Sequence, residues 1–188
     1  MEQESKLTPQ QSLTLITEVI NQTKENIKSH SFIFLLWGWT LAIASILRFL
    51  IQTQSNFKYY FLPFPILVTL ALMVTINYNR NKTSETHLNF FLKKLWIALA
   101  IGFIAIVFVS IYQKIEPFTY TLILAAIGTT VSGMAMNFKP LVFGGVCFLV
   151  ASIGCLFVAD EYKVLIHGFA IIVGYLIPGY ILKNSKSK

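Results

Sequence analysis

The sequence predicts an all-α membrane protein: a polytopic bundle of six transmembrane helices with a short amphipathic cytoplasmic helix at the N-terminus. Residues 31–52 form an apolar stretch with a single charge, and five more apolar stretches follow it. A helix needs about 20 apolar residues to cross a bilayer core about 30 Å thick. Only 12% of the residues are charged, whereas soluble domains carry roughly 25%. The six stretches leave no room for a separate soluble catalytic domain.

The predicted organisation has three parts: a cytoplasmic helical arm in residues 1–30, a transmembrane domain in residues 31–182, and a basic cytoplasmic tail in residues 183–188. Because the later connections are short, consecutive spans are expected to be antiparallel neighbours. The six expected spans cover residues 31–52, 60–78, 95–112, 117–136, 140–159 and 162–182.

The arm has the signals of an amphipathic helix. Thr8 and Gln11 fit a capping box, and Pro9 falls at the first helical position, where its missing N–H costs nothing. Apolar residues then recur at steps of three and four, which is typical of one buried helix face. This stripe is a candidate partner face, made of Leu13, Ile16, Ile20 and Ile27. It could pack on the protein's own inner loops or on a second copy, lie in the membrane interface, or bind a separate membrane partner.

The basic residues indicate the orientation of the bundle, because cytoplasmic loops of membrane proteins are enriched in Lys and Arg. One side of the predicted topology carries eleven: Lys6, Lys24, Lys28, Arg80, Lys82, Lys93, Lys94, Lys139, Lys183, Lys186 and Lys188. The other side carries three: Lys58, Lys114 and Lys163. Both termini are therefore expected in the cytoplasm. The net charge of +7 is spread between spans, so it does not indicate nucleic-acid binding.

Three short motifs carry a resemblance to a known group of proteins. They are Trp37-Gly38 in the first span, Phe138-Lys139-Pro140-Leu141 before the fifth, and Pro178-Gly179-Tyr180-Ile181-Leu182 at the end of the sixth. With these motifs the chain resembles small multi-spanning inner-membrane proteins of Bacteroidetes-type bacteria, which also have a short amphipathic N-terminal helix. The resemblance implies a location in the bacterial inner membrane. It brings no known activity and no catalytic residues.

Arg48 is the one charge inside a predicted span, and ionisable residues at membrane depth are costly and often functional. It lies about four residues from the outer end of its helix, so its side chain could also snorkel to the surface. Glu116, Asp160 and Glu161 are all expected on the same side and could pair with it. His167 is expected at a similar depth, and a His there would suit proton coupling. Together these residues form a candidate polar cluster, either structural or facing a substrate.

The last span contains Gly174, Pro178 and Gly179. Two interpretations are open for them: a kink of the kind that marks binding sites in transporters, or a Pro-Gly pair that ends the helix. The second is the favoured prediction.

For function, the sequence favours a non-enzymatic accessory or regulatory membrane component. The alternative is a small transporter or channel that uses the polar cluster around Arg48 and His167. No nucleotide-binding loop, zinc-ligand set or nucleophile elbow is present, so no enzyme activity, cofactor or metal is expected. The expected partners are the lipid bilayer and either a second copy or another membrane protein bound through the arm.

Overall fold

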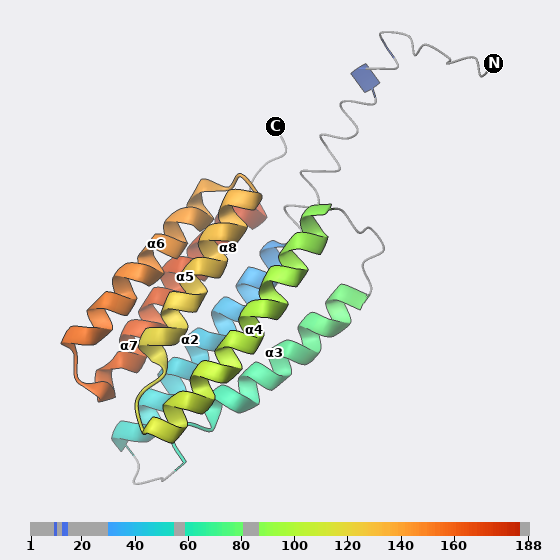
Figure 1. The fold of residues 1–188 in the computed structure, drawn as a ribbon. Coiled ribbons are helices and arrows are strands. Elements are labelled where there is room, and N and C mark those ends of the chain that lie inside the picture. The colour runs from blue at the N-terminus through green and yellow to red at the C-terminus, as the bar shows by residue number, and fades with distance from the viewer. Residues whose placement is uncertain (1–9, 11–12, 15–29, 55–58, 81–86, 185–188) are drawn as a thin grey trace.

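The computed structural model describes residues 10, 13–14, 30–54, 59–80 and 87–184, and its regular structure in these residues is entirely helical. The long helices run alternately up and down side by side, so that α2 begins and α8 ends at the same end of the bundle (Figure 1). The prediction of an all-α fold is confirmed. The helices are α2 (Ser31–Gln54), α3 (Pro63–Arg80), α4 (His87–Gln113), α5 (Phe118–Ala135), α6 (Lys139–Gly154), η1 (Cys155–Phe157), α7 (Asp160–Ile171), η2 (Ile172–Leu176) and α8 (Ile177–Asn184).

In the described part of the chain, five helical segments are long and apolar enough to cross a membrane. They are α2, α4, α5, the continuous segment Lys139–Phe157 and the continuous segment Asp160–Asn184. This is consistent with a multi-pass membrane protein. Helix α3 has 18 residues but ends in the polar sequence Asn77-Tyr78-Asn79-Arg80, so it is less apolar over its length than the other five.

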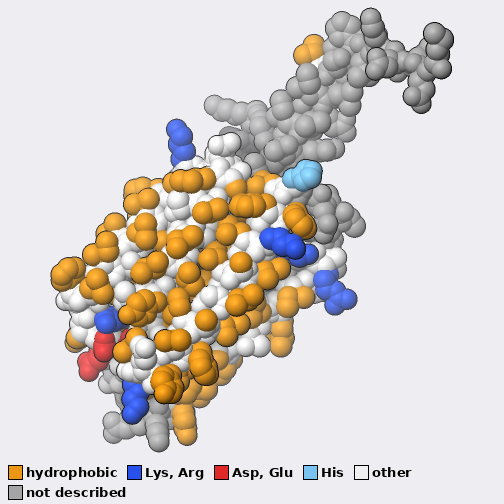
Figure 2. Space-filling model, viewed as in Figure 1, with side chains coloured by type: hydrophobic (Ala, Val, Ile, Leu, Met, Phe, Trp, Pro, Cys, Tyr) orange, Lys and Arg blue, Asp and Glu red, His pale blue; other side chains and the backbone are white. Residues whose placement is uncertain are grey.

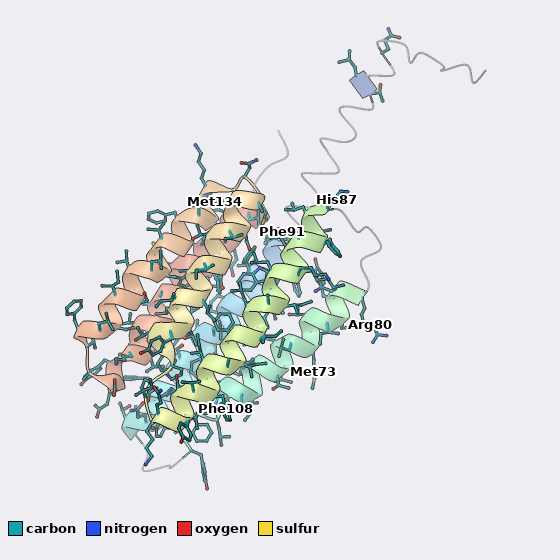
Figure 3. All side chains as sticks on the ribbon, in the orientation of Figure 1. Met73, Arg80, His87, Phe91, Phe108 and Met134 are labelled. Carbon is teal, nitrogen blue, oxygen red and sulfur yellow. The ribbon has the colours of Figure 1, made fainter. Side chains whose placement is uncertain are left out.

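Hydrophobic side chains cover much of the bundle face shown in Figure 2. Figure 3 shows Met73 of α3 and Phe108 of α4 pointing away from the bundle, and these side chains are 61% and 72% exposed. In water such a surface would be unusual for a single chain, whereas in a bilayer it faces lipid. Helices α3 and α4 contribute most to it: α3 buries only Pro63 and Ala71, and α4 only Leu92, Leu99 and Ser110.

The centre of the bundle lies where α2, α5, α6 and the α7–η2–α8 segment meet, and glycines bring their backbones together there. A Cβ at Gly133 of α5 would lie 2.7 Å from the backbone nitrogen of Val142 on α6. A Cβ at Gly144 of α6 would lie 2.5 Å from the carbonyl oxygen of Gly174 in η2. In lipid, small residues at such crossings allow the close approach that holds helices together.

The prediction that Pro178 and Gly179 end the last helix is wrong, because α8 continues to Asn184. Pro178 has no N–H to donate to the carbonyl four residues earlier, and its ring crowds that carbonyl. The five residues of η2 form a π-helical turn directly before it, in which the N–H of Ile177 bonds to the carbonyl of Ile172. A π turn widens the helix locally, so the chain passes the proline without stopping. Helix α4 begins at His87, before the expected third span of residues 95–112, as a helix that starts in the preceding loop would.

Candidate functional site

Arg48 lies on the buried face of α2, near the end at which that helix stops. The same face carries Gly38, Ala42 and Ser45, which are buried and recur at steps of three and four. Because these side chains are small, α7 and η2 can lie close to α2 along this face: Gly168 of α7 packs against Ser45, and Leu176 of η2 against Gly38. The stripe ends at Arg48, which is 6% exposed.

Glu116 is positioned by the way α4 ends. Lys114 takes a left-handed conformation with φ of 57°. Its N–H bonds to the carbonyl of Ile111, and the N–H of Ile115 bonds to the carbonyl of Ser110. This is the Schellman pattern, which reverses the chain after a helix. Glu116 therefore follows in the short connection before α5.

Arg48 and Glu116 form an ion pair across the bundle. The Nη2 atom of Arg48 donates to Oε1 of Glu116 at 2.6 Å, and the two side chains are 7% and 18% exposed. A charge-assisted hydrogen bond of this length is stronger than a neutral one. The pair ties α2 to the α4–α5 connection.

Two aromatic rings flank the guanidinium group. Its carbon Cζ lies 4.7 Å from the ring centroid of Phe118, at the start of α5, and 5.2 Å from that of Tyr60, just before α3. Both distances lie within the range of cation–π attraction. The charge of Arg48 is thus met by one carboxylate and two ring faces, all from its own chain.

His167 of α7 joins the same cluster through shared neighbours. Its ring centroid lies 5.0 Å from that of Phe118 and 5.8 Å from that of Phe64. Its Nδ1 lies 2.9 Å from Oγ of Ser45, which donates its hydroxyl proton to the carbonyl of Leu41 at 2.8 Å. Since a serine has only one hydroxyl proton, the hydrogen bond of Ser45 to Leu41 favours the tautomer of His167 in which Nδ1 donates to Ser45 and Nε2 is the acceptor. We call Arg48, Glu116, Tyr60, Phe118, Ser45 and His167 the Arg48 cluster.

Two polar atoms beside this cluster have no hydrogen-bond partner in the described part of the chain. They are Nε of Arg48 and Oε1 of Gln52, both buried. They offer one donor and one acceptor, a single helical turn apart on α2.

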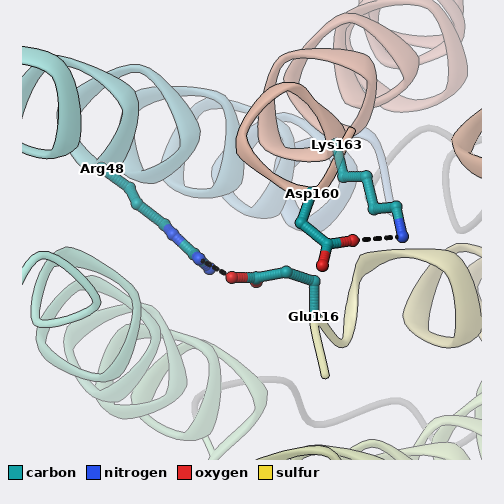
Figure 4. Close-up of polar contacts among 4 residues, drawn as sticks. All are labelled: Arg48, Glu116, Asp160 and Lys163. Carbon is teal, nitrogen blue, oxygen red and sulfur yellow. Dashed lines mark hydrogen bonds and ion pairs between the residues drawn. The ribbon is translucent and has the colours of Figure 1, made fainter. Parts of the chain in front are cut away.

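The other two residues of the predicted cluster, Asp160 and Glu161, do not pair with Arg48. Asp160 pairs with Lys163, three residues later on α7, at 2.6 Å, rather than with Arg48 (Figure 4). Glu161 is exposed in the first turn of the same helix. Both carboxylates stand at a helix N-terminus, where the helix dipole favours negative charge. Their placement is explained locally, without the Arg48 cluster.

Sequence reasoning missed the residues that enclose Arg48. Tyr60, Phe118 and Ser45 are not among the residues of the predicted polar cluster. Ser45 and Gln52 could have been found from helical spacing, because they precede and follow Arg48 by three and four residues. The rings of Tyr60 and Phe118 had no such signal, since Tyr60 precedes α3 and Phe118 begins α5.

The predicted partner face lies almost entirely outside the described residues. Leu13 is described and is 64% exposed, while Ile16, Ile20 and Ile27 are not described. The amphipathic helix of residues 1–30 therefore stays a prediction.

Two grooves lie on the lipid-facing surface, and neither includes a residue of the Arg48 cluster. The α2–α3 groove is lined by Phe32, Leu35, Leu36, Trp39, Thr40, Ile43 and Leu67. The α6–α8 groove is lined by Lys139, Pro140, Phe143, Val173, Ile177, Pro178 and Ile181. Among the described residues, no group of three His, Cys, Asp or Glu side chains is placed to hold a metal ion.

The fold and the cluster define a class: in its described residues, an all-helical bundle with five helical segments that could span a membrane and a buried ion pair near one end. Comparison of the chain with protein-family models, curated proteins and solved structures found no match. The resemblance to small inner-membrane proteins of Bacteroidetes-type bacteria stays a sequence prediction.

Proposed function

We propose that this protein is a non-enzymatic accessory or regulatory component of a bacterial inner membrane, with six spans. One observation carries the proposal: the charge of Arg48 is bound by Glu116, Phe118 and Tyr60 of its own chain. A charge engaged in this way stabilises one helix arrangement and is not presented to a substrate. The protein would then act through its surfaces, by binding another membrane component.

Helix α3 is the sixth span in this proposal, and its contacts with α2 support that role. Nε1 of Trp37 donates to Oγ1 of Thr75 at 3.2 Å, and the rings of Phe32 and Tyr78 lie 4.6 Å apart. At the other end of α3, Phe64 contacts Phe118 and His167. Helix α3 therefore accompanies α2 from the Arg48 cluster almost to the start of α2, and lies at the same depth.

Both termini are proposed to lie in the cytoplasm. In the described part of the chain, five basic residues lie toward the end where α8 stops, since Arg80 ends α3, Lys93 and Lys94 follow the start of α4, Lys139 begins α6, and Lys183 is in the last turn of α8. The opposite end has Lys114 and Lys163, together with Glu116, Asp160 and Glu161. In a variant without Cys147 and Cys155, a single cysteine at Asn184 should resist a membrane-impermeant maleimide added to intact cells, and one at Lys114 should react. The reverse result would overturn this orientation.

Native mass spectrometry of the protein, released from its own membrane with surrounding lipid, tests the accessory role. We expect one other protein to accompany the full chain in a fixed ratio. It should be lost when residues 1–28 are deleted, because the predicted partner face lies there. Membrane insertion of the shortened chain, measured by fractionation, is the control. Full-length protein that carries only lipid, alone or as a homodimer, would contradict the accessory role.

Transport is the second candidate, favoured by the unpartnered Nε of Arg48 and Oε1 of Gln52 and by the acceptor Nε2 of His167. Proton flux can be measured with purified protein in vesicles that enclose a pH-sensitive dye. Flux above that of empty vesicles, lost in His167→Ala and Arg48→Gln, would support transport. Flux equal to that of empty vesicles would exclude a proton pathway.

A further inference from the structure

The α6–α8 groove runs along the bundle surface and ends at a lysine. Its volume is about 330 Å³. Lys139, Pro140 and Phe143 line it from α6, and Val173, Ile177 and Ile181 from the η2–α8 segment. The last three recur every four residues, so they form one face of their helix over about 12 Å. Phe143, Ile177 and Ile181 are each 45% exposed or more.

Charge distinguishes the two ends of this groove. Lys139 is exposed and is the first residue of α6, at the end of the bundle that also carries Lys183. All three carboxylates of the described part, Glu116, Asp160 and Glu161, lie near the opposite end. The positive charge of Lys139 therefore has no described carboxylate near it. It lies at one end of the otherwise apolar α6–α8 groove.

We propose that the α6–α8 groove binds an acidic phospholipid, with one acyl chain along Val173, Ile177 and Ile181 and the phosphate at Lys139. Basic groups between transmembrane helices on the cytoplasmic side are known to bind anionic headgroups. The α2–α3 groove provides an internal comparison. It is as large, at about 340 Å³, but Lys and Arg are absent from its lining. A lipid whose acyl chain binds in the α2–α3 groove should therefore show no preference for headgroup charge.

The test uses delipidated full-length protein in a non-ionic detergent, titrated with phosphatidylglycerol or phosphatidylcholine and followed by native mass spectrometry. The wild type should bind one phosphatidylglycerol several-fold more tightly than phosphatidylcholine. Lys139→Gln should lower the affinity for phosphatidylglycerol about fivefold, the size expected for one lysine near an anionic lipid. Lys114→Gln, which removes an exposed charge at the other end, should leave the affinity unchanged.

A second pair of variants tests the groove itself. Ile177→Trp fills the α6–α8 groove and should weaken phosphatidylglycerol binding, whereas Ile43→Trp fills the α2–α3 groove and should not. Circular dichroism and gel filtration establish that each variant is folded. Three results would overturn the proposal: no preference between the two lipids in the wild type, equal losses in Lys139→Gln and Lys114→Gln, or unchanged binding in a folded Ile177→Trp variant.

Discussion

The central helices and the peripheral helices of this bundle are held by different kinds of contact. Helices α5, α6 and η2 meet backbone to backbone at Gly133, Gly144 and Gly174. Helices α3 and α4 bury few side chains and expose most of their length. In water, α3 and α4 would be poorly packed helices. Lipid is as apolar as their surfaces, so there is no hydrophobic driving force to bury them.

Each peripheral helix is instead linked to a neighbour by a tryptophan. Nε1 of Trp37 on α2 donates to Thr75 on α3, and Nε1 of Trp96 on α4 donates to Ser132 on α5, both at 3.2 Å. The Arg48–Glu116 pair adds a third link between α2 and the α4–α5 connection. The comparison teaches that helix backbones approach closely in the centre, whereas side-chain contacts, both polar and aromatic, hold the periphery.

The largest expected effect is that of Gly144→Ala, which places a methyl group between the backbones of α6 and η2. The new Cβ would lie 2.5 Å from the carbonyl oxygen of Gly174, and a backbone atom cannot move aside as a flexible side chain can. We expect a loss of roughly 3 kcal/mol in the free energy of unfolding, at the upper end for overpacking. Unfolding in mixed lipid–detergent micelles measures it.

Gly154→Ala is the matched control on the same helical segment, because a Cβ at Gly154 meets nothing within 4 Å. Its effect should stay within about 0.5 kcal/mol. Equal losses in the two alanine variants would show that backbone approach does not stabilise the centre.

The next effect is expected from Glu116→Gln, which leaves the buried guanidinium without a carboxylate. Removing one partner of a fully buried pair costs about 3–5 kcal/mol. Glu116 is partly exposed and a glutamine can still accept a hydrogen bond, so we expect about 2 kcal/mol. A double-mutant cycle with Arg48→Gln should give a coupling free energy above about 1 kcal/mol. Independent, additive effects would mean that the pair does not join α2 to the α4–α5 connection.

Trp96→Phe is expected to have a smaller effect than Glu116→Gln, because it removes the donor to Ser132 and the indole atoms that pack beside Gly128 but keeps an aromatic ring on α4. Hydrogen bonds between membrane helices contribute about 0.6 kcal/mol on average, and we expect a loss of at least that size. Trp39→Phe is the control: its N–H donates to the hydroxyl of Tyr180 at an exposed site. A larger loss for Trp39 than for Trp96 would contradict the proposed role of Trp96 in holding α4.

The smallest coupling free energy is expected for the Asp160–Lys163 pair. Its N–O distance of 2.6 Å equals that of the Arg48–Glu116 pair, but it is less buried. The side chain of Asp160 is 67% exposed, and exposed pairs couple by about 0.2–1 kcal/mol. A cycle with Asp160→Asn and Lys163→Gln should give a coupling near the lower limit, which salt reduces further. A coupling as large as that of Arg48 and Glu116 would show that burial does not separate the two pairs.

The all-α fold could be predicted because apolar length is a direct signal of a membrane helix. The grouping of Arg48, Glu116 and His167 could be anticipated because alternating spans put all three at one end. Asp160 could not be assigned from this argument, since a lysine one turn away on its own helix is a nearer partner than an arginine on another. The π turn was missed as well. Sequence shows the proline, but not whether the bundle holds the helix on both sides of it.

The π turn at Ile172–Leu176 also separates the two halves of the last helix in rotational phase. A regular α-helix turns by about 100° with each residue, so one surplus residue turns everything beyond it by that amount. His167 lies before the turn and bonds to Ser45 of α2, while Tyr180 lies after it and bonds to Trp39 of the same helix. Both halves of the last helix therefore contact α2, although the π turn between them interrupts the regular α-helix. Deleting one residue from the turn would leave a regular α-helix of about the same length, whereas winding all five residues into a regular α-helix would change the angle between the two contacts by about 100°.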